Sequence, residues 1–167
     1  MKVISGLLIK GFKQTESAAA TWTTSEVSLP SAIREGIGVS IVKVEMGPDT
    51  PADIPAAGAQ PEAVSALLLE EDKAAFPDLT DPDIIARTSL LTYGDGVNVQ
   101  AVILNQYGYK NLVPYTLGYI TGREKIFQGL ISTNAAAASS MAGRMYMYQV
   151  KFTQAELVEL GFRESFE

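Results

Sequence analysis

Residues 125–132 read KIFQGLIS and residues 144–152 read RMYMYQVKF, and these two stretches decide the fold. Both are rich in β-branched and aromatic residues, which favour extended strands. The linker between them, residues 133–143, reads TNAAAASSMAG and consists mostly of small residues. The sequence therefore predicts two long strands near the end of the chain, joined by a connection that lets another surface approach closely.

A short helix is predicted directly after the second strand. Thr153 and Glu156 have the spacing of a capping box, in which each side chain bonds the backbone amide of the other residue. Gly161 is a typical C-terminal stop. The apolar face of this helix would comprise Leu157, Val158 and Leu160.

Strand signals also dominate the first part of the chain. Residues 21–29 (TWTTSEVSL) are rich in β-branched residues and end at Pro30, and residues 37–46 (IGVSIVKVEM) follow a turn. Strict alternation puts apolar residues on both faces of the second stretch, with Val39 and Ile41 opposite Val42, Val44 and Met46. This pattern predicts a strand that is covered on both sides, as in a sandwich or at an interface.

The middle of the chain adds a loop, an ambiguous segment and a hairpin. Residues 47–61 are rich in proline and predict a loop. Residues 62–73 fit a helix or a short buried strand, and the β character of the rest favours a strand. The Asp95-Gly pair between residues 86–93 and 97–104 is a hairpin signal.

These elements predict an all-β protein with seven to nine strands. The expected architecture is an antiparallel β-sandwich or barrel with a short C-terminal helix. A length of 167 residues fits a single domain over 1–167, because neither side of the proline-rich loop could close a sandwich alone.

Composition narrows the classes of function. The chain has no histidine and no cysteine, which removes the usual general base and thiolate metal ligands, so we expect no enzyme. A net charge of −6, with 13 scattered basic residues, argues against nucleic acid as the main partner. No apolar run approaches the roughly 20 residues of a membrane span. Charged residues make up only 19%, which suits either an assembling subunit or an alanine-rich monomer.

Three carboxylates, Asp78, Asp81 and Asp83, fall within six residues. Clustered oxygen ligands of this type bind hard cations, so one hypothesis is weak stabilisation by a structural Ca²⁺. A solvated, proline-bounded acidic loop explains the same residues. The neighbouring Glu70, Glu71 and Asp72 are consecutive and cannot face one another across a hydrolase cleft.

Aromatic residues offer a second candidate site. They could form a platform for sugars or for a partner protein, although packing or subunit contact is the favoured explanation. The residues concerned are Trp22, Tyr107, Tyr109, Tyr115 and Tyr119.

The opening and closing stretches resemble small single-jelly-roll viral capsid proteins from environmental virus genomes. The residues that carry the resemblance are 21–29 and 37–45 at the start, and 125–131, 134–138 and 144–150 at the end. The resemblance implies an eight-stranded single jelly roll in two sheets and a role in building a shell. It also implies that the first and last strands pair, which would place the Trp22 strand beside residues 144–152.

The N-terminus departs from the pattern of many such capsid proteins, because residues 1–20 contain only Lys2, Lys10 and Lys13 instead of an arginine-rich arm. We therefore expect direct nucleic-acid binding to be weak or absent. The expected function is a structural capsid subunit that self-assembles into a closed viral shell within the virion, alone or with other virion proteins. The alternative is a β-sandwich module that binds carbohydrate or another ligand through an aromatic surface.

Overall fold

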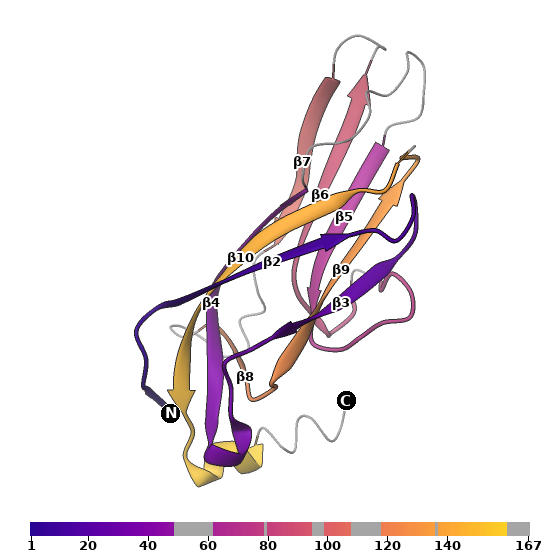
Figure 1. The fold of residues 1–167 in the computed structure, drawn as a ribbon. Helices are drawn as coiled ribbons and strands as arrows, with labels where there is room; N and C mark the ends of the chain where they lie inside the picture. The colour runs from indigo at the N-terminus through magenta and orange to yellow at the C-terminus, as the bar shows by residue number, and fades with distance from the viewer. Residues whose placement is uncertain (49–61, 79, 95–98, 108–117, 136, 160–167) are drawn as a thin grey trace.

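The computed structural model describes residues 1–167 except 49–61, 79, 95–98, 108–117, 136 and 160–167. The described residues form two antiparallel sheets of five strands each (Figure 1). The first sheet contains β1 (Lys2–Val3), β2 (Leu8–Thr15), β10 (Ser140–Lys151), β4 (Ile37–Pro48) and β8 (Tyr119–Thr121). The second contains, in order, β3 (Thr23–Ser28), β9 (Lys125–Thr133), β5 (Glu62–Leu69), β6 (Ile84–Gly94) and β7 (Val99–Tyr107).

This architecture confirms the predicted all-β, antiparallel β-sandwich. The two closing strands form as expected, and so do the strand from Ile37, the strand from Glu62 and the β6–β7 hairpin. The turn of that hairpin and most of the proline-rich loop lie outside the described residues.

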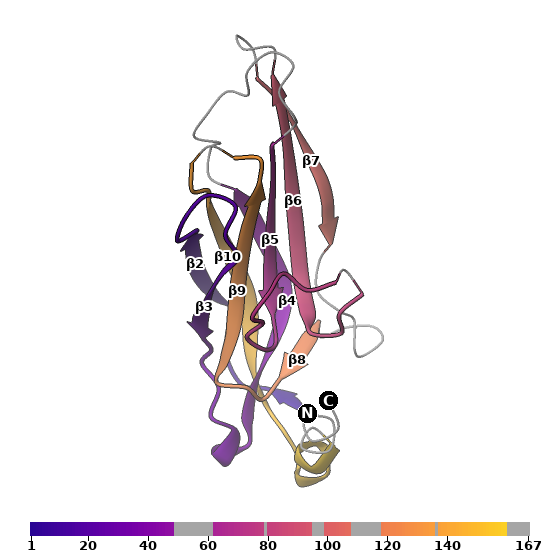
Figure 2. The same ribbon diagram turned by 90° about the vertical axis from the view of Figure 1, so that its right-hand side faces the viewer.

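Strand pairing connects segments that are far apart in the sequence. β5 pairs with β6, β4 with β8, β3 with β9, and β2 with β10, so the four pairs are nested around the β5–β6 connection. β10 also pairs with β4, and β9 also pairs with β5, which joins the nested pairs into two sheets. Figure 2 shows the two sheets facing each other.

The predicted partner of the last strand was wrong. The Trp22 strand, β3, pairs with β9 instead of β10, and Val27 lies opposite Ile126. β10 pairs with β4 on one side and with β1 and β2 on the other, and the sequence did not indicate β2 as a strand. Lys10 interrupts the apolar alternation of β2, which is possible because the strand lies at a sheet edge where this side chain stays exposed.

The prediction that β4 is covered on both faces holds at the start of the strand, where Gly38 and Ser40 are also buried. Further along, Lys43 and Glu45 are exposed, and a β-bulge explains the apolar pattern. Tyr146 pairs with Lys43 and Met147 pairs with Ile41, so Val42 is an extra residue in β4. A bulge shifts the alternation of the side chains by one position. Ile41 on one side of the bulge and Val44 on the other therefore both pack into the same core.

The main core lies between the sheets. It includes the fully buried Met141, Met145 and Met147 of β10, which contact apolar residues from the second sheet such as Leu68 and Leu130. A smaller apolar cluster contains Leu67, Leu69 and Ile84, with Trp22 and Phe127 packed against it. Two clusters explain why residues 66–69 are continuously apolar: successive side chains point to opposite faces of β5, and both faces are covered.

A short helix over residues 154–159 follows β10 and confirms the predicted capping box. The Thr153 amide donates to Glu156 Oε2 at 2.8 Å, and the Glu156 amide lies 3.4 Å from Thr153 Oγ1. The Met1 amino group also donates to Glu156, at 2.5 Å. The predicted stop at Gly161 lies outside the described residues.

Candidate interaction surfaces

In the acidic loop between β5 and β6, two carboxylates pair with a lysine and a third accepts hydrogen bonds from a threonine. Lys73 pairs with Asp83 and, at 3.3 Å, with Asp81, and the Asp83 carboxylate raises the pKa of the Lys73 amine. Asp78 instead accepts from the Thr80 amide at 2.9 Å, which lowers the pKa of Asp78. Among the described residues, no three potential metal ligands converge on one point. The structure thus provides no positive support for the hypothetical Ca²⁺ site at Asp78, Asp81 and Asp83.

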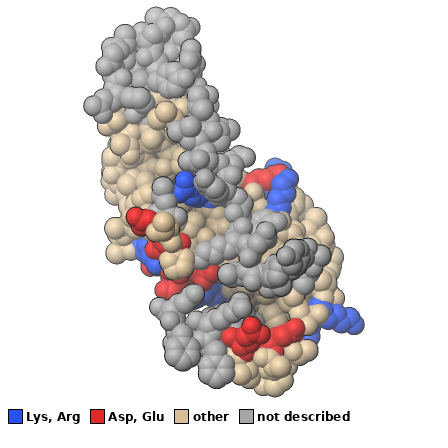
Figure 3. Space-filling model, turned by 180° about the vertical axis from the view of Figure 1, so that it is seen from behind, with Lys and Arg blue, Asp and Glu red and all other residues tan. Residues whose placement is uncertain are grey.

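A buried polar group lies where this loop begins. Tyr119 is 2% exposed, and burial together with the Glu70 carboxylate raises the pKa of its hydroxyl, which stays protonated at neutral pH. Arg123 donates to Glu71 at 3.1 Å, and its backbone amide donates to Thr121 Oγ1 at 3.0 Å. Seen from behind, acidic and basic side chains lie next to one another on the molecular surface (Figure 3). These contacts tie the loop to the rest of the fold.

The predicted aromatic platform does not form from the two members whose side chains are described. Tyr119 is buried in the core and cannot stack on a ligand. Trp22 is half-buried: its indole nitrogen donates to the Lys73 carbonyl at 2.7 Å, and its ring meets Phe76 edge-on at 5.5 Å. Tyr107 ends β7, but its side chain lies outside the described residues, as do Tyr109 and Tyr115.

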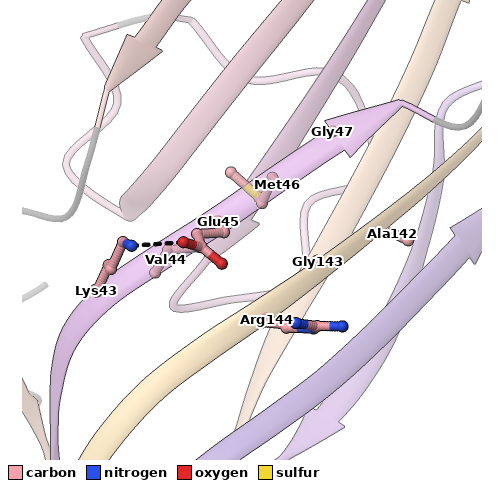
Figure 4. Close-up of a pocket in the computed structure, with 8 residues that line it drawn as sticks. All are labelled: Lys43, Val44, Glu45, Met46, Gly47, Ala142, Gly143 and Arg144. Carbon is pink, nitrogen blue, oxygen red and sulfur yellow. Dashed lines mark hydrogen bonds and ion pairs between the residues drawn. The ribbon is translucent and has the colours of Figure 1, made fainter.

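An open hollow of about 560 Å³ lies over the paired strands β4 and β10 (Figure 4). Two of the charged residues in its lining are paired with each other: Glu45 accepts from Lys43 at 2.5 Å, and it also accepts from the Tyr146 hydroxyl at 2.8 Å. Lys43 lowers the pKa of Glu45 through this hydrogen bond, and Tyr146 adds to the effect. Arg144 extends away from this pair in Figure 4. The lining also includes the small residues Gly47, Ala142 and Gly143.

The edge of the first sheet exposes an unusual run of apolar side chains, which we call the N-terminal strip. Four of the six exposed large hydrophobic residues in the described chain belong to it. They are Val3 (41% exposed), Ile4 (46%), Leu7 (49%) and Ile9 (60%). Contiguous exposed apolar surface on a protein commonly marks an interaction site.

A groove adjoins this strip between the edges of the two sheets. It has a volume of about 360 Å³ and separates the start of β2 from the end of β3. Leu29 and Pro30 line one wall, Leu8 and Ile9 line the other, and Lys10 stands at its rim. Within the described residues, β2 pairs with β10 on one side only, so its other edge presents unpaired backbone groups.

Glu16 was not singled out from the sequence, yet it organises the turn after β2. Its side chain is 4% exposed, and its carboxylate accepts from the Ser132 amide at 2.5 Å, the Ser132 hydroxyl at 2.7 Å and the Ser139 amide at 2.8 Å. The Ala20 amide also donates to Ser132 Oγ, at 3.1 Å. The surface that approaches the small-residue linker is thus the β2–β3 turn of the same chain.

The chain matches no protein-family model, and searches of curated proteins and of solved structures returned no significant match. No helix in the described part of the chain is long and apolar enough to cross a membrane. The fold and its surfaces therefore define the protein only as an antiparallel β-sandwich with an exposed apolar edge.

Proposed function

We propose that the domain is an eight-stranded single jelly roll. A jelly roll arises when a long antiparallel hairpin of four strand pairs curls into two sheets. The nested pairs β2–β10, β3–β9, β4–β8 and β5–β6 are the pairs expected of such a hairpin. On this interpretation β1 and β7 are additions, each at the edge of a sheet.

We further propose that the protein is a non-enzymatic capsid subunit, which self-assembles into a closed viral shell and resides in the virion. The observation that carries this proposal is the exposed apolar N-terminal strip beside the edge of β2 that pairs with no other strand of the described residues. Burial of apolar surface drives the association of proteins, and an exposed strand edge is a template for pairing with another chain. Jelly rolls are a common architecture of viral capsid domains.

The alternative, a sandwich module that binds carbohydrate through aromatic side chains, has less support. Of its five candidate residues, Tyr119 is buried and Trp22 is occupied by Lys73 and Phe76. Both residues serve packing, which leaves this alternative without a described ligand surface.

Assembly can be tested by measuring the mass of the purified protein from low to high micromolar concentration by light scattering. We expect discrete oligomers or particles, and disruption of assembly when Ile9, the most exposed residue of the strip, is changed in Ile9→Asp. Val158→Asp is a control, because Val158 is an exposed apolar residue (49%) on the helix over residues 154–159. A wild-type protein that stays monomeric across salt and pH would contradict the proposal.

A further inference from the structure

We infer that neighbouring copies of this chain bind head to tail, with the acidic β5–β6 loop of one copy seated on the N-terminal strip and its groove on the next copy. This inference rests on the proposed assembly and specifies its contact surfaces. The occupant of the groove is therefore a second copy of the same chain.

Charge complementarity is the first argument. Residues 70–83 contain six carboxylates and one lysine. Asp81 and Asp83 pair with Lys73, Glu71 pairs with Arg123 and Glu70 is buried, so the negative charge that the loop presents to a partner lies mainly at Asp72 and Asp78. Residues 1–15 contain three lysines and no carboxylate. Lys2, Lys10 and Lys13 are all exposed, as are Asp72 and Asp78 of the loop. Opposite potentials of this kind steer two surfaces together and set their register.

Apolar fit is the second argument. The loop presents Ala74, Ala75 and Phe76 at its surface, and Phe76 is 36% exposed although its ring contacts Trp22. The groove beside the strip is lined by apolar side chains and, at about 360 Å³, has room for one aromatic ring. Phe76 is flanked in the sequence by the acidic Asp72 and Asp78, and the apolar groove is flanked by the basic Lys10. The two surfaces are therefore complementary in both apolar character and charge.

The position of the two surfaces decides the symmetry of the contact. In Figure 1 the N-terminal segment lies on the left and the β5–β6 loop projects on the right, and in Figure 2 the loop and β2 again lie apart. A contact of the strip with itself would bring like charges together. A contact between two different surfaces is heterologous, and such contacts generate rings when the rotation between copies closes.

Charge reversal and rescue test this contact. We expect Lys10→Glu to raise the concentration at which half of the protein assembles by about tenfold or more, because the new carboxylate would face the acidic loop. Asp78→Lys should have a similar effect. The double variant Lys10→Glu/Asp78→Lys should recover most of the wild-type assembly. Arg34→Glu is the matched control: Arg34 is exposed in the turn before β4, ten residues along the chain from Val44, which lies level with Lys10.

A cross-linking measurement remains informative if a charge variant folds poorly. The chain has no cysteine, so Lys10→Cys/Asp78→Cys introduces the only two thiols. Under mild oxidation we expect a ladder of covalent oligomers on a non-reducing gel, and far fewer from Arg34→Cys/Asp78→Cys.

The outcomes separate the contact from the assembly itself. Wild-type particles that are unaffected by charge reversal, together with no ladder from the cysteine pair, would overturn the head-to-tail contact and leave the proposed shell function intact. A wild-type protein that never assembles would overturn both. Loss of assembly in both single variants with rescue in the double variant would establish the contact.

Discussion

Glu16 shows how one residue can hold two distant parts of the chain together. Its carboxylate collects three hydrogen bonds from Ser132 and Ser139, which flank the linker between β9 and β10. Because the site is buried, removing the carboxylate leaves two backbone amides and a hydroxyl to be satisfied in another way. This contact fixes the linker that joins the two sheets.

Replacement of Glu16 should therefore be costly. We expect Glu16→Ala to reduce the free energy of unfolding by about 3 kcal/mol, since hydrogen bonds to a charged group contribute about 1.5–3 kcal/mol each and are not additive. Urea unfolding followed by circular dichroism measures the change. Glu35→Ala, at an exposed carboxylate, should change stability by less than about 0.5 kcal/mol, and an equal loss in both variants would refute the role of Glu16.

Gly129 lies at a position in β9 where the Trp22 side chain approaches the backbone closely. A Cβ atom there would lie 2.1 Å from the Trp22 ring, so only glycine leaves room for the indole against β9. We expect Gly129→Ala to displace Trp22 and shift its fluorescence emission to longer wavelength. Trp22 is the single tryptophan of the chain, so the signal is unambiguous. Gly47→Ala, where a Cβ meets nothing within 4 Å, should leave the emission unchanged.

At the residue scale, local motifs were predictable and long-range contacts were not. Thr153 and Glu156 lie three positions apart, so their mutual hydrogen bonds follow from spacing alone. Glu16 lies 116 positions from Ser132, and nothing in its immediate neighbours marks it as buried. Tyr119 was considered as a ligand contact because aromatic residues serve cores and binding surfaces alike.

At the scale of elements, the bulge in β4 explains the apolar pattern of that strand. It also predicts that two neighbouring residues, Ile41 and Val42, contribute differently to stability. Ile41 is fully buried, whereas Val42 is the extra residue of the bulge and only partly buried. We expect Ile41→Ala to cost about 3 kcal/mol and Val42→Ala less than about 1 kcal/mol in unfolding free energy. Equal costs would show that β4 is covered on both faces at the bulge as well.

The C-terminal helix has a pH-dependent attachment. The hydrogen bond from the Met1 amine, with those from Thr153, lowers the pKa of Glu156 to about 2. A carboxyl whose pKa is depressed in the folded state stabilises that state above its unfolded pKa, near 4.5, and loses this contribution as the pH falls toward 2. The stability difference between the wild type and Glu156→Gln should therefore shrink over this range. A difference that stays constant in acid-titrated urea unfolding would contradict this linkage.

Elements with clean local signals were predicted correctly, and the edge strand was missed. The β6–β7 hairpin carries an Asp-Gly pair, and the strand over residues 125–132 has a continuous β-type composition. In β2, Leu8, Lys10, Phe12 and Gln14 share the face toward the second sheet, so a lysine and a glutamine occupy positions where the pattern demands apolar residues. Lys10 is tolerated because solvent reaches it at this edge, whereas Gln14 is buried and accepts a hydrogen bond from the Ser25 hydroxyl.

At the scale of the whole molecule, the nested pairing brings β2 and β10, near the two ends of the chain, into one sheet. Sequence patterns identified most strands but not their partners, because pairing depends on long-range register and not on local composition. The apolar N-terminal strip lies at the edge of the first sheet, and the acidic β5–β6 loop lies on another side of the molecule. This polarity is what a head-to-tail assembly requires.

The most direct test of the proposed assembly is negative-stain electron microscopy of the concentrated wild-type protein, beside Lys10→Glu and the double variant Lys10→Glu/Asp78→Lys. We expect closed particles of uniform size from the wild type, dispersed subunits from Lys10→Glu, and particles again from the double variant. A field of monomers from the wild type, at every salt concentration and pH tested, would contradict a shell-forming function.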